Sequence, residues 1–141
     1  MMPNDPYANL DPVFRARLKV FESELLKRNI RAEPTSGYRS MAAQRALYAQ
    51  GRTAPGRIVT KAKPGSSAHN FGMAMDYVPV VGHRTYHVKP LWWVKFGLAA
   101  RAARLAWGGL WKFRDRCHVE LPDWRKRVYA THARHNPQNG L

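Results

Sequence analysis

Two short segments, far apart in the chain, each contain a histidine and a carboxylate, and together they constrain the fold more than any other feature. The first segment contains His69 and Asp76, and the second contains Asp115 and His118. Two imidazoles and one carboxylate suit zinc and leave a fourth position open for water, which is typical of a catalytic site. Because the chain has a single cysteine, a closed structural site built from thiolates is not expected. A zinc-binding fold must therefore bring the two segments together.

Strand geometry indicates how these segments can meet, because alternate side chains of an extended segment share a face. A strand is predicted over 73–80, and Asp76 lies on one of its faces. A second strand, predicted over 117–121, has His118 on one face. If the two strands are neighbours, the carboxylate and the imidazole lie together, and His69 approaches from the preceding loop.

Apolar periodicity and end signals predict the other elements. The expected helices span 12–28, 41–50, 90–107 and 122–135, and the last of them is short and basic. The expected strands span 30–34, 73–80 and 117–121, and 111–113 is expected either to pair with the last strand or to lead into it. The third helix is expected to carry Leu91, Val94, Leu98, Ala102 and Leu105 on one apolar face. Because the elements follow a mixed order without a βαβ repeat, we expect an α+β fold with an antiparallel-rich sheet.

Length and composition are those of one globular domain, 1–141. The chain has 141 residues, of which 45% are hydrophobic. Its first residues lack the basic and apolar regions of a signal peptide, and no stretch approaches the roughly 20 apolar residues of a membrane span. We therefore expect synthesis in a cytoplasm and an export route for any work outside it. A long loop over 52–67 is expected to be functional, since such loops are uncommon inside compact domains.

Net charge is the second strong compositional feature. The formal charge is +15 and the isoelectric point is about 10.8, so the chain attracts polyanions such as nucleic acid or an anionic cell envelope. Its basic residues are scattered from Arg15 to Arg134, with no zinc-finger spacing and no RNP-like motif, so no specific nucleic-acid partner is expected. Charge alone leaves open whether it serves solubility or adhesion.

The motifs considered together are more specific than any one of them. Ser-x-His-x-x-Gly-x-Ala-x-Asp runs over 67–76, and Asp-x-x-His-x-Glu runs over 115–120. Upstream, 36–40 contains Arg39, and Gln44 follows it. This combination resembles the zinc D-Ala-D-Ala carboxypeptidase (VanY-type) peptidases, and the similarity extends over about 30–121, the expected motif core. The family includes D,D-carboxypeptidases, D,D-dipeptidases and the L-alanyl-D-glutamate peptidases of phage endolysins.

The resemblance implies a fold and a role for each motif residue. The implied fold is a small domain of the hedgehog/D,D-peptidase type, with helices flanking a sheet that carries Zn²⁺. The matching zinc ligands are His69, Asp76 and His118. Asp115 matches the catalytic acid/base, and Arg39 matches the arginine that stabilises the oxyanion. Ser67 and Glu120 match positions that contact substrate or orient a ligand.

The implied function is that of a zinc-dependent peptidoglycan peptidase. Aspartate at position 115 resembles the endolysin branch, which implies a phage or prophage endolysin that cleaves the L-Ala–D-Glu bond of the murein stem peptide. Such a monomer waits in the host cytoplasm until a holin opens the inner membrane and then acts in the periplasm, where its charge favours the anionic envelope surface. Two alternatives stay open: a D,D-carboxypeptidase or dipeptidase that removes D-Ala, and a non-catalytic polyanion-binding protein on the same fold.

Overall fold

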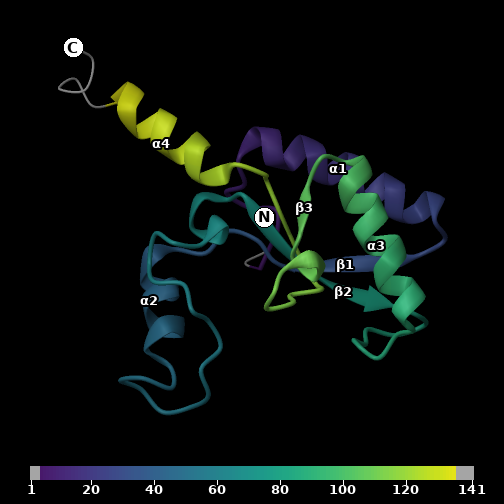
Figure 1. Ribbon diagram of the computed structural model, residues 1–141, viewed down its shortest axis with the longest axis horizontal. Helices are drawn as coiled ribbons and strands as arrows, with labels where there is room; N and C mark the ends of the chain where they lie inside the picture. The colour runs from purple at the N-terminus through teal and green to yellow at the C-terminus, as the bar shows by residue number, and fades with distance from the viewer. Residues whose placement is uncertain (1–3, 136–141) are drawn as a thin grey trace.

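A four-stranded sheet lies at the centre of the computed structural model, which describes residues 4–135 (Figure 1). Its strands are β1 (Arg31–Ser36), β2 (Ala74–Val80), β3 (Ala106–Trp107) and β4 (His118–Glu120). Their spatial order is β1-β2-β4-β3, and every neighbouring pair is antiparallel. The expected α+β fold with an antiparallel-rich sheet is therefore confirmed.

Four α-helices accompany this sheet in the described part of the chain. They are α1 (Pro12–Lys27), α2 (Met41–Ala49), α3 (Pro90–Ala102) and α4 (Trp124–His135), and two 3-10 turns are η1 (Ala68–Phe71) and η2 (Gly108–Leu110). Helices α1 and α3 contact each other beside the sheet, whereas α2 and the long loop after it lie on the opposite side of the molecule and α4 extends away from the body (Figure 1). No helix among residues 4–135 combines the length and hydropathy that a membrane crossing requires.

The first two helices begin where their capping residues predict. The Asp11 carboxylate accepts a hydrogen bond from the backbone N–H of Phe14 at 3.0 Å, and Pro12 occupies the first turn. The Ser40 hydroxyl accepts one from the N–H of Ala43 at 3.0 Å. Such caps satisfy amide groups that have no partner inside the helix.

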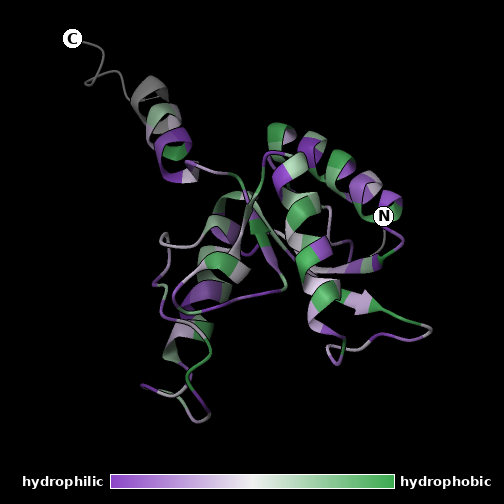
Figure 2. Ribbon diagram, turned by 45° about the vertical axis from the view of Figure 1, so that its right-hand side comes forward, coloured by the Kyte–Doolittle hydropathy of each residue, from purple (hydrophilic) through white to green (hydrophobic). Residues whose placement is uncertain are grey.

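The hydrophobic core lies between α1, α3 and one face of the sheet. Every predicted core residue of α1 is buried: Phe14, Leu18, Phe21 and Leu25. The ring of Phe21 packs edge-on against Tyr77 of β2 and Phe96 of α3, with centroid separations of 5.2 and 5.1 Å. Figure 2 shows hydrophobic and hydrophilic residues alternating along α1. Burial of each large apolar side chain contributes roughly 1.5–3 kcal/mol, so this face of β2 is firmly held.

The apolar face predicted for the third helix is not the face that α3 buries, although Leu105, which follows the helix, is buried. The buried residues of α3 are Trp92, Trp93, Phe96, Ala99 and Ala100. On the predicted face, Leu91, Val94 and Leu98 are 62%, 49% and 49% exposed. Two tryptophans and a phenylalanine remove more apolar surface from water than aliphatic residues do, and this difference orients the helix.

A strand over 111–113 is wrong, and the alternative, that this segment leads into the last strand, is right, because the chain turns back earlier than a strand there requires. Helix α3 ends at Ala102, and Arg104 adopts a left-handed conformation with φ 59°. Two residues of β3 then pair with β4, and Trp111 follows η2 in an irregular segment. The indole N–H of Trp107 donates to the Arg116 carbonyl at 2.7 Å, which fixes the segment that leads into β4.

Candidate metal centre and active site

Strands β2 and β4 bring the two sequence motifs together. Asp76 and His118 are direct partners in the antiparallel register, as the alternation of side chains predicts. His69 lies on η1 and not in an irregular loop, and Gly72 ends this turn with a left-handed φ of 68°. A Cβ atom at Gly72 would collide with the carbonyl oxygen of Asn9, so glycine is required there on two grounds.

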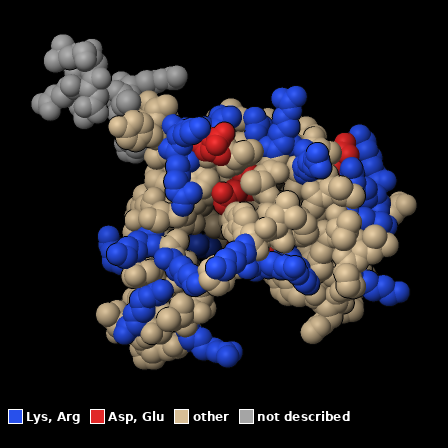
Figure 3. All heavy atoms as spheres, viewed as in Figure 1, with Lys and Arg blue, Asp and Glu red and all other residues tan. Residues whose placement is uncertain are grey.

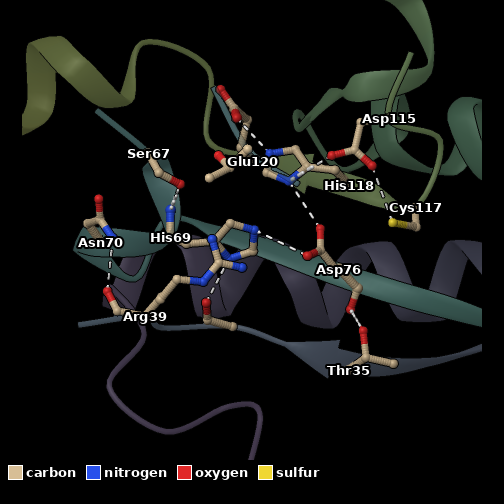
Figure 4. Close-up of polar contacts among 12 residues, drawn as sticks. Thr35, Arg39, Ser67, His69, Asn70, Asp76, Asp115, Cys117, His118 and Glu120 are labelled. Atoms are coloured by element: carbon tan, nitrogen blue, oxygen red, sulfur yellow. Dashed lines mark hydrogen bonds and ion pairs between the residues drawn. The ribbon is translucent and has the colours of Figure 1, made fainter. Parts of the chain in front are cut away.

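Asp76 contacts both imidazoles, one with each carboxylate oxygen (Figure 4). Its Oδ1 lies 3.1 Å from Nδ1 of His118, and its Oδ2 lies 3.4 Å from Nε2 of His69. One ligand atom from each of these residues can be chosen so that all three lie within 4.8 Å of one another. Both imidazoles are buried, at 4% and 6% exposure. Two nitrogens and a carboxylate oxygen that converge in this way fit a zinc ion with an open position.

The other nitrogen of each imidazole is also hydrogen-bonded, which fixes the orientation of both rings. Nδ1 of His69 donates to the carbonyl oxygen of Gly37 at 2.7 Å. Nε2 of His118 donates to Oε1 of Glu120, also at 2.7 Å. Such partners set the tautomer and raise the basicity of metal-binding histidines. Glu120 is thus placed to orient the metal-binding ring of His118. The hydrogen bond from His69 to the Gly37 carbonyl was not predicted, because any residue can supply a backbone carbonyl.

The electrostatics of the cluster favour a charged pair. Burial alone would lower the pKa of His118, but hydrogen bonds to Asp76 and Glu120 outweigh it and raise that pKa to about 9. Burial opposes ionisation of Asp76, and its hydrogen bonds with His118 and His69 nevertheless hold its pKa well below the usual range. A divalent cation at these atoms must therefore displace a proton from His118.

Asp115 stands at the edge of the cluster without being part of its hydrogen-bond network. Its Oδ2 lies 3.9 Å from Nδ1 of His118, and its side chain is 47% exposed. Its Oδ1 accepts a hydrogen bond from Sγ of Cys117 at 3.3 Å. This carboxylate can exchange protons with a molecule bound at the cluster without itself being needed to hold a metal.

Arg39 is held beside the cluster by buried polar groups. Its guanidinium donates to Oε1 of Gln44 at 3.0 Å, and Gln44 is fully buried. The amide of Gln44 donates in turn to the Ala62 carbonyl at 2.8 Å. The side chain of Asn70 donates to the Arg39 carbonyl at 3.1 Å. This role of Asn70 was not predicted from the sequence, although its position directly after the candidate ligand His69 is a usable signal.

Ser67 occupies a structural position at the start of η1. Its hydroxyl accepts a hydrogen bond from the backbone N–H of His69 at 3.3 Å, and its side chain also lines the cleft described next. It therefore orients the backbone that carries His69 and can still contact a bound molecule.

The cluster opens into a cleft of about 640 Å³. Val59 and Thr60 of the long loop line this cleft. Trp111 lines the cleft as well, and its ring lies 5.1 Å from that of His118. Arg125 of α4 also lines it. Figure 3 shows basic side chains around the hollow on this face of the molecule.

Comparison with known proteins shows the family. The family model of VanY, D-alanyl-D-alanine carboxypeptidase, matches residues 8–91. The peptidoglycan L-alanyl-D-glutamate endopeptidase CwlK of Bacillus subtilis is 31% identical over 124 residues, which cover 81% of this chain and 74% of that protein. The chain belongs to the VanY peptidase family, so the expectation of an enzyme of this class is confirmed.

Solved structures share the fold. The L-Ala D-Glu endopeptidase ChiX of Serratia marcescens superposes with a TM-score of 0.64 at 23% identity, covering 88% of this chain and 86% of the other. The vancomycin resistance D,D-pentapeptidase VanY, in complex with Zn(II), superposes with a TM-score of 0.59 at 13% identity, covering 87% and 78%. The D,D-peptidase-like fold implied by the motifs is thus confirmed.

Proposed function

We propose that the chain is a zinc-dependent peptidoglycan peptidase that hydrolyses the bond between L-Ala and D-Glu of the stem peptide. The observation that carries this proposal is the cluster of His69, Asp76 and His118 at the cleft, since it fits zinc and leaves a position open. The substrate class is supported by the CwlK relative, an L-alanyl-D-glutamate endopeptidase.

The side chains have separable tasks in this reaction. Nε2 of His69, the carboxylate of Asp76 and Nδ1 of His118 would hold the metal. Bound there, zinc would supply Lewis acidity and lower the pKa of water towards about 7. Asp115 accepts the proton of the attacking water and returns it to the leaving amine, a contribution of about 10²–10⁴-fold in rate. Arg39 stabilises the negative charge that develops on the carbonyl oxygen. Such an interaction lowers the free energy of the transition state by roughly 3–4 kcal/mol.

Metal content and product analysis test this proposal together. Purified protein should contain one zinc, and chelation should abolish hydrolysis of peptidoglycan. The His118→Ala variant should lose metal and activity in parallel. Mass spectrometry of digested peptidoglycan should show peptides that begin at D-Glu. A metal-free protein whose activity survives chelation contradicts the zinc site.

A second candidate function is favoured by the family model, whose description is D-alanyl-D-alanine carboxypeptidase. A D,D-carboxypeptidase or dipeptidase on this scaffold removes terminal D-Ala and leaves the L-Ala–D-Glu bond intact. The same mass spectra separate the two functions, because loss of D-Ala and release of D-Glu peptides give different masses. Salt-sensitive binding to peptidoglycan without cleavage would instead identify a non-catalytic polyanion-binding protein.

We also propose that the enzyme is a monomeric phage or prophage endolysin that reaches the periplasm from the host cytoplasm after a holin opens the inner membrane. Aspartate at position 115 and the +15 charge support this assignment. Expression in Gram-negative cells should cause lysis when the inner membrane is permeabilised and not before. Lysis at the same rate in cells with an intact inner membrane contradicts holin dependence.

A further inference from the structure

A second cavity lies next to the cleft, and Asp115 lines both. It has a volume of about 400 Å³, and we call it the arginine pocket. Its lining residues are Tyr86, Trp93, Arg114, Asp115, Arg116 and Cys117. The metal-binding cluster lines the cleft and not this pocket. Asp115 therefore marks the boundary between two spaces of different chemical character.

The two oxygens of the Asp115 carboxylate contact residues of different cavities. Oδ1 accepts a hydrogen bond from Cys117, which lines the arginine pocket. Oδ2 is the oxygen 3.9 Å from His118, which lines the cleft. In Figure 4, Asp115 accordingly lies between Cys117 and His118. A group that receives a proton from Asp115 must lie at this boundary.

The proposed reaction places one particular residue of the substrate there. Hydrolysis adds the hydroxyl of water to the carbonyl carbon of L-Ala, breaks the C–N bond and gives a proton to the nitrogen of D-Glu. If Asp115 delivers that proton, the nitrogen of D-Glu lies within hydrogen-bond reach of its carboxylate. D-Glu, unlike L-Ala, also carries a carboxyl group outside the scissile bond. This anionic group then lies close to the entrance of the arginine pocket.

The pocket has the chemistry to bind such a group. Arg114 and Arg116 are both exposed, and neither forms an ion pair with a carboxylate among the side chains that the structure describes. Guanidinium groups bind carboxylates through paired, charge-assisted hydrogen bonds. Tyr86 adds a phenolic hydroxyl, and the indole of Trp93 forms an apolar wall.

We propose that Arg114 and Arg116 form a subsite for the free carboxylate of the substrate residue that follows the scissile bond. The inference rests on the proposed L-Ala–D-Glu activity with Asp115 as proton donor. The subsite selects substrates whose leaving amine belongs to an acidic residue. Arg125 lines the cleft and not the arginine pocket, so it does not serve this purpose.

Two soluble peptides that differ in one group test the subsite. Both contain the L-Ala–D-Glu bond; one has a free carboxylate on D-Glu and the other has a carboxamide there. The wild-type kcat/KM should be about tenfold higher for the acid, the size of one charge-assisted hydrogen bond. The double variant Arg114→Gln/Arg116→Gln should lose this preference through a lower kcat/KM on the acid alone. Lys112→Gln, in the same loop but outside both cavities, should retain it.

Product inhibition of the unaltered enzyme gives a measurement that does not depend on how the variants fold. A dipeptide that begins with D-Glu should inhibit about tenfold more strongly than its carboxamide. Three outcomes would contradict the subsite and leave the proposed function unaffected. They are equal inhibition by the two dipeptides, an equal fall in kcat/KM on both peptides in the double variant, and loss of the preference for the acid in Arg125→Gln. If the wild-type enzyme cleaves neither peptide at the L-Ala–D-Glu bond, the proposed function and the subsite fail together.

Discussion

Asp76 uses both of its carboxylate oxygens, one for each imidazole of the cluster, and this pairing explains how a carboxylate can lie within a strand. The side chain of Asp76 is only 22% exposed, so an unpaired carboxylate there would be unfavourable. In the metal-free protein the proton on His118 balances the charge. Because zinc and this proton compete for the same nitrogen, the residues that raise the pKa of His118 also set the pH dependence of metal binding.

The raised pKa of His118 predicts how the stability of the metal-free protein depends on pH. This pKa is about 9 in the folded protein, against 6.5 for the free side chain. The stabilisation is fully present below pH 6.5, where His118 is protonated in both states, and is lost as pH rises towards about 9. Chemical denaturation of chelated protein across this range should show a falling free energy of unfolding.

The Glu120→Gln variant provides the control for that experiment. It removes one of the hydrogen-bonded carboxylates that raise the pKa of His118, so the decline should be smaller and should end at a lower pH. Saturating zinc should suppress the decline in the wild-type protein, since the metal replaces the proton. A flat profile for the chelated wild type would show that folding does not raise the pKa of His118.

Asp115 should be needed for turnover and not for metal binding. The Asp115→Asn variant should keep its zinc, because the carboxylate lies outside the three-ligand set. Its kcat on a soluble peptide should fall about 10²–10⁴-fold, because the amide cannot shuttle the proton. Zinc content and single-turnover rates measure the two properties separately. Near-normal hydrolysis by this variant would move the acid/base role to Glu120.

At the level of secondary structure, Trp107 links α3 to the strand that carries His118. Its indole packs where a side chain at Gly97 would otherwise lie, and its N–H holds the Arg116 carbonyl. Trp107 therefore contributes both to the packing of α3 and to the position of the segment that leads into β4. A close approach of this kind requires glycine on the helix, even though glycine costs about 1 kcal/mol in a helix interior.

Substitution of Gly97 should therefore destabilise the protein. Alanine there improves helix propensity by about 1 kcal/mol, but its Cβ would collide with the Trp107 indole. Overpacking of this kind costs about 1–3 kcal/mol, so the free energy of unfolding should fall. Val94→Ala, on the exposed side of α3, is the matched control and should change it by about 0.5 kcal/mol or less. Increased stability of Gly97→Ala would mean that Trp107 is not held against the helix.

Over the molecule as a whole, acidic residues are few, and three of the nine line the cleft. The chain has 24 basic and 9 acidic residues, and Asp76, Asp115 and Glu120 all line the cleft. The surface around this cleft is consequently basic (Figure 3). Such a field draws the enzyme to an anionic polymer, whereas the acid groups inside the cleft act over bond distances.

Salt should therefore affect attachment to the cell wall more than the chemical step. Lysis of sacculi should fall steeply with salt, because attraction beyond about 8 Å is screened at physiological ionic strength. Hydrolysis of a short soluble peptide should fall much less. Lys126→Gln/Arg127→Gln on α4 should mimic high salt on sacculi and spare the soluble peptide; Arg125 is left intact because it lines the cleft. Identical salt curves for both substrates would contradict adhesion as the role of the charge.

The sequence alone was sufficient to predict the capped starts of α1 and α2, the buried residues of α1 and the pairing of Asp76 with His118. These features depend on period, capping and the two-residue repeat of strands, which act over a few residues and can be read along the chain. The motif resemblance likewise identified the family.

Only the tertiary structure decided which face of α3 is buried, that the carbonyl of Gly37 orients His69, and that Asp115 separates two cavities. Each of these depends on partners distant in sequence: aromatic volume shared between α3 and α1, a backbone group on another element, and two loops that meet at one carboxylate. Such contacts form in the arrangement of the whole chain that buries the most apolar surface while its polar groups are hydrogen-bonded. A short sequence pattern cannot predict them, because it gives no information about which distant segments will pack together.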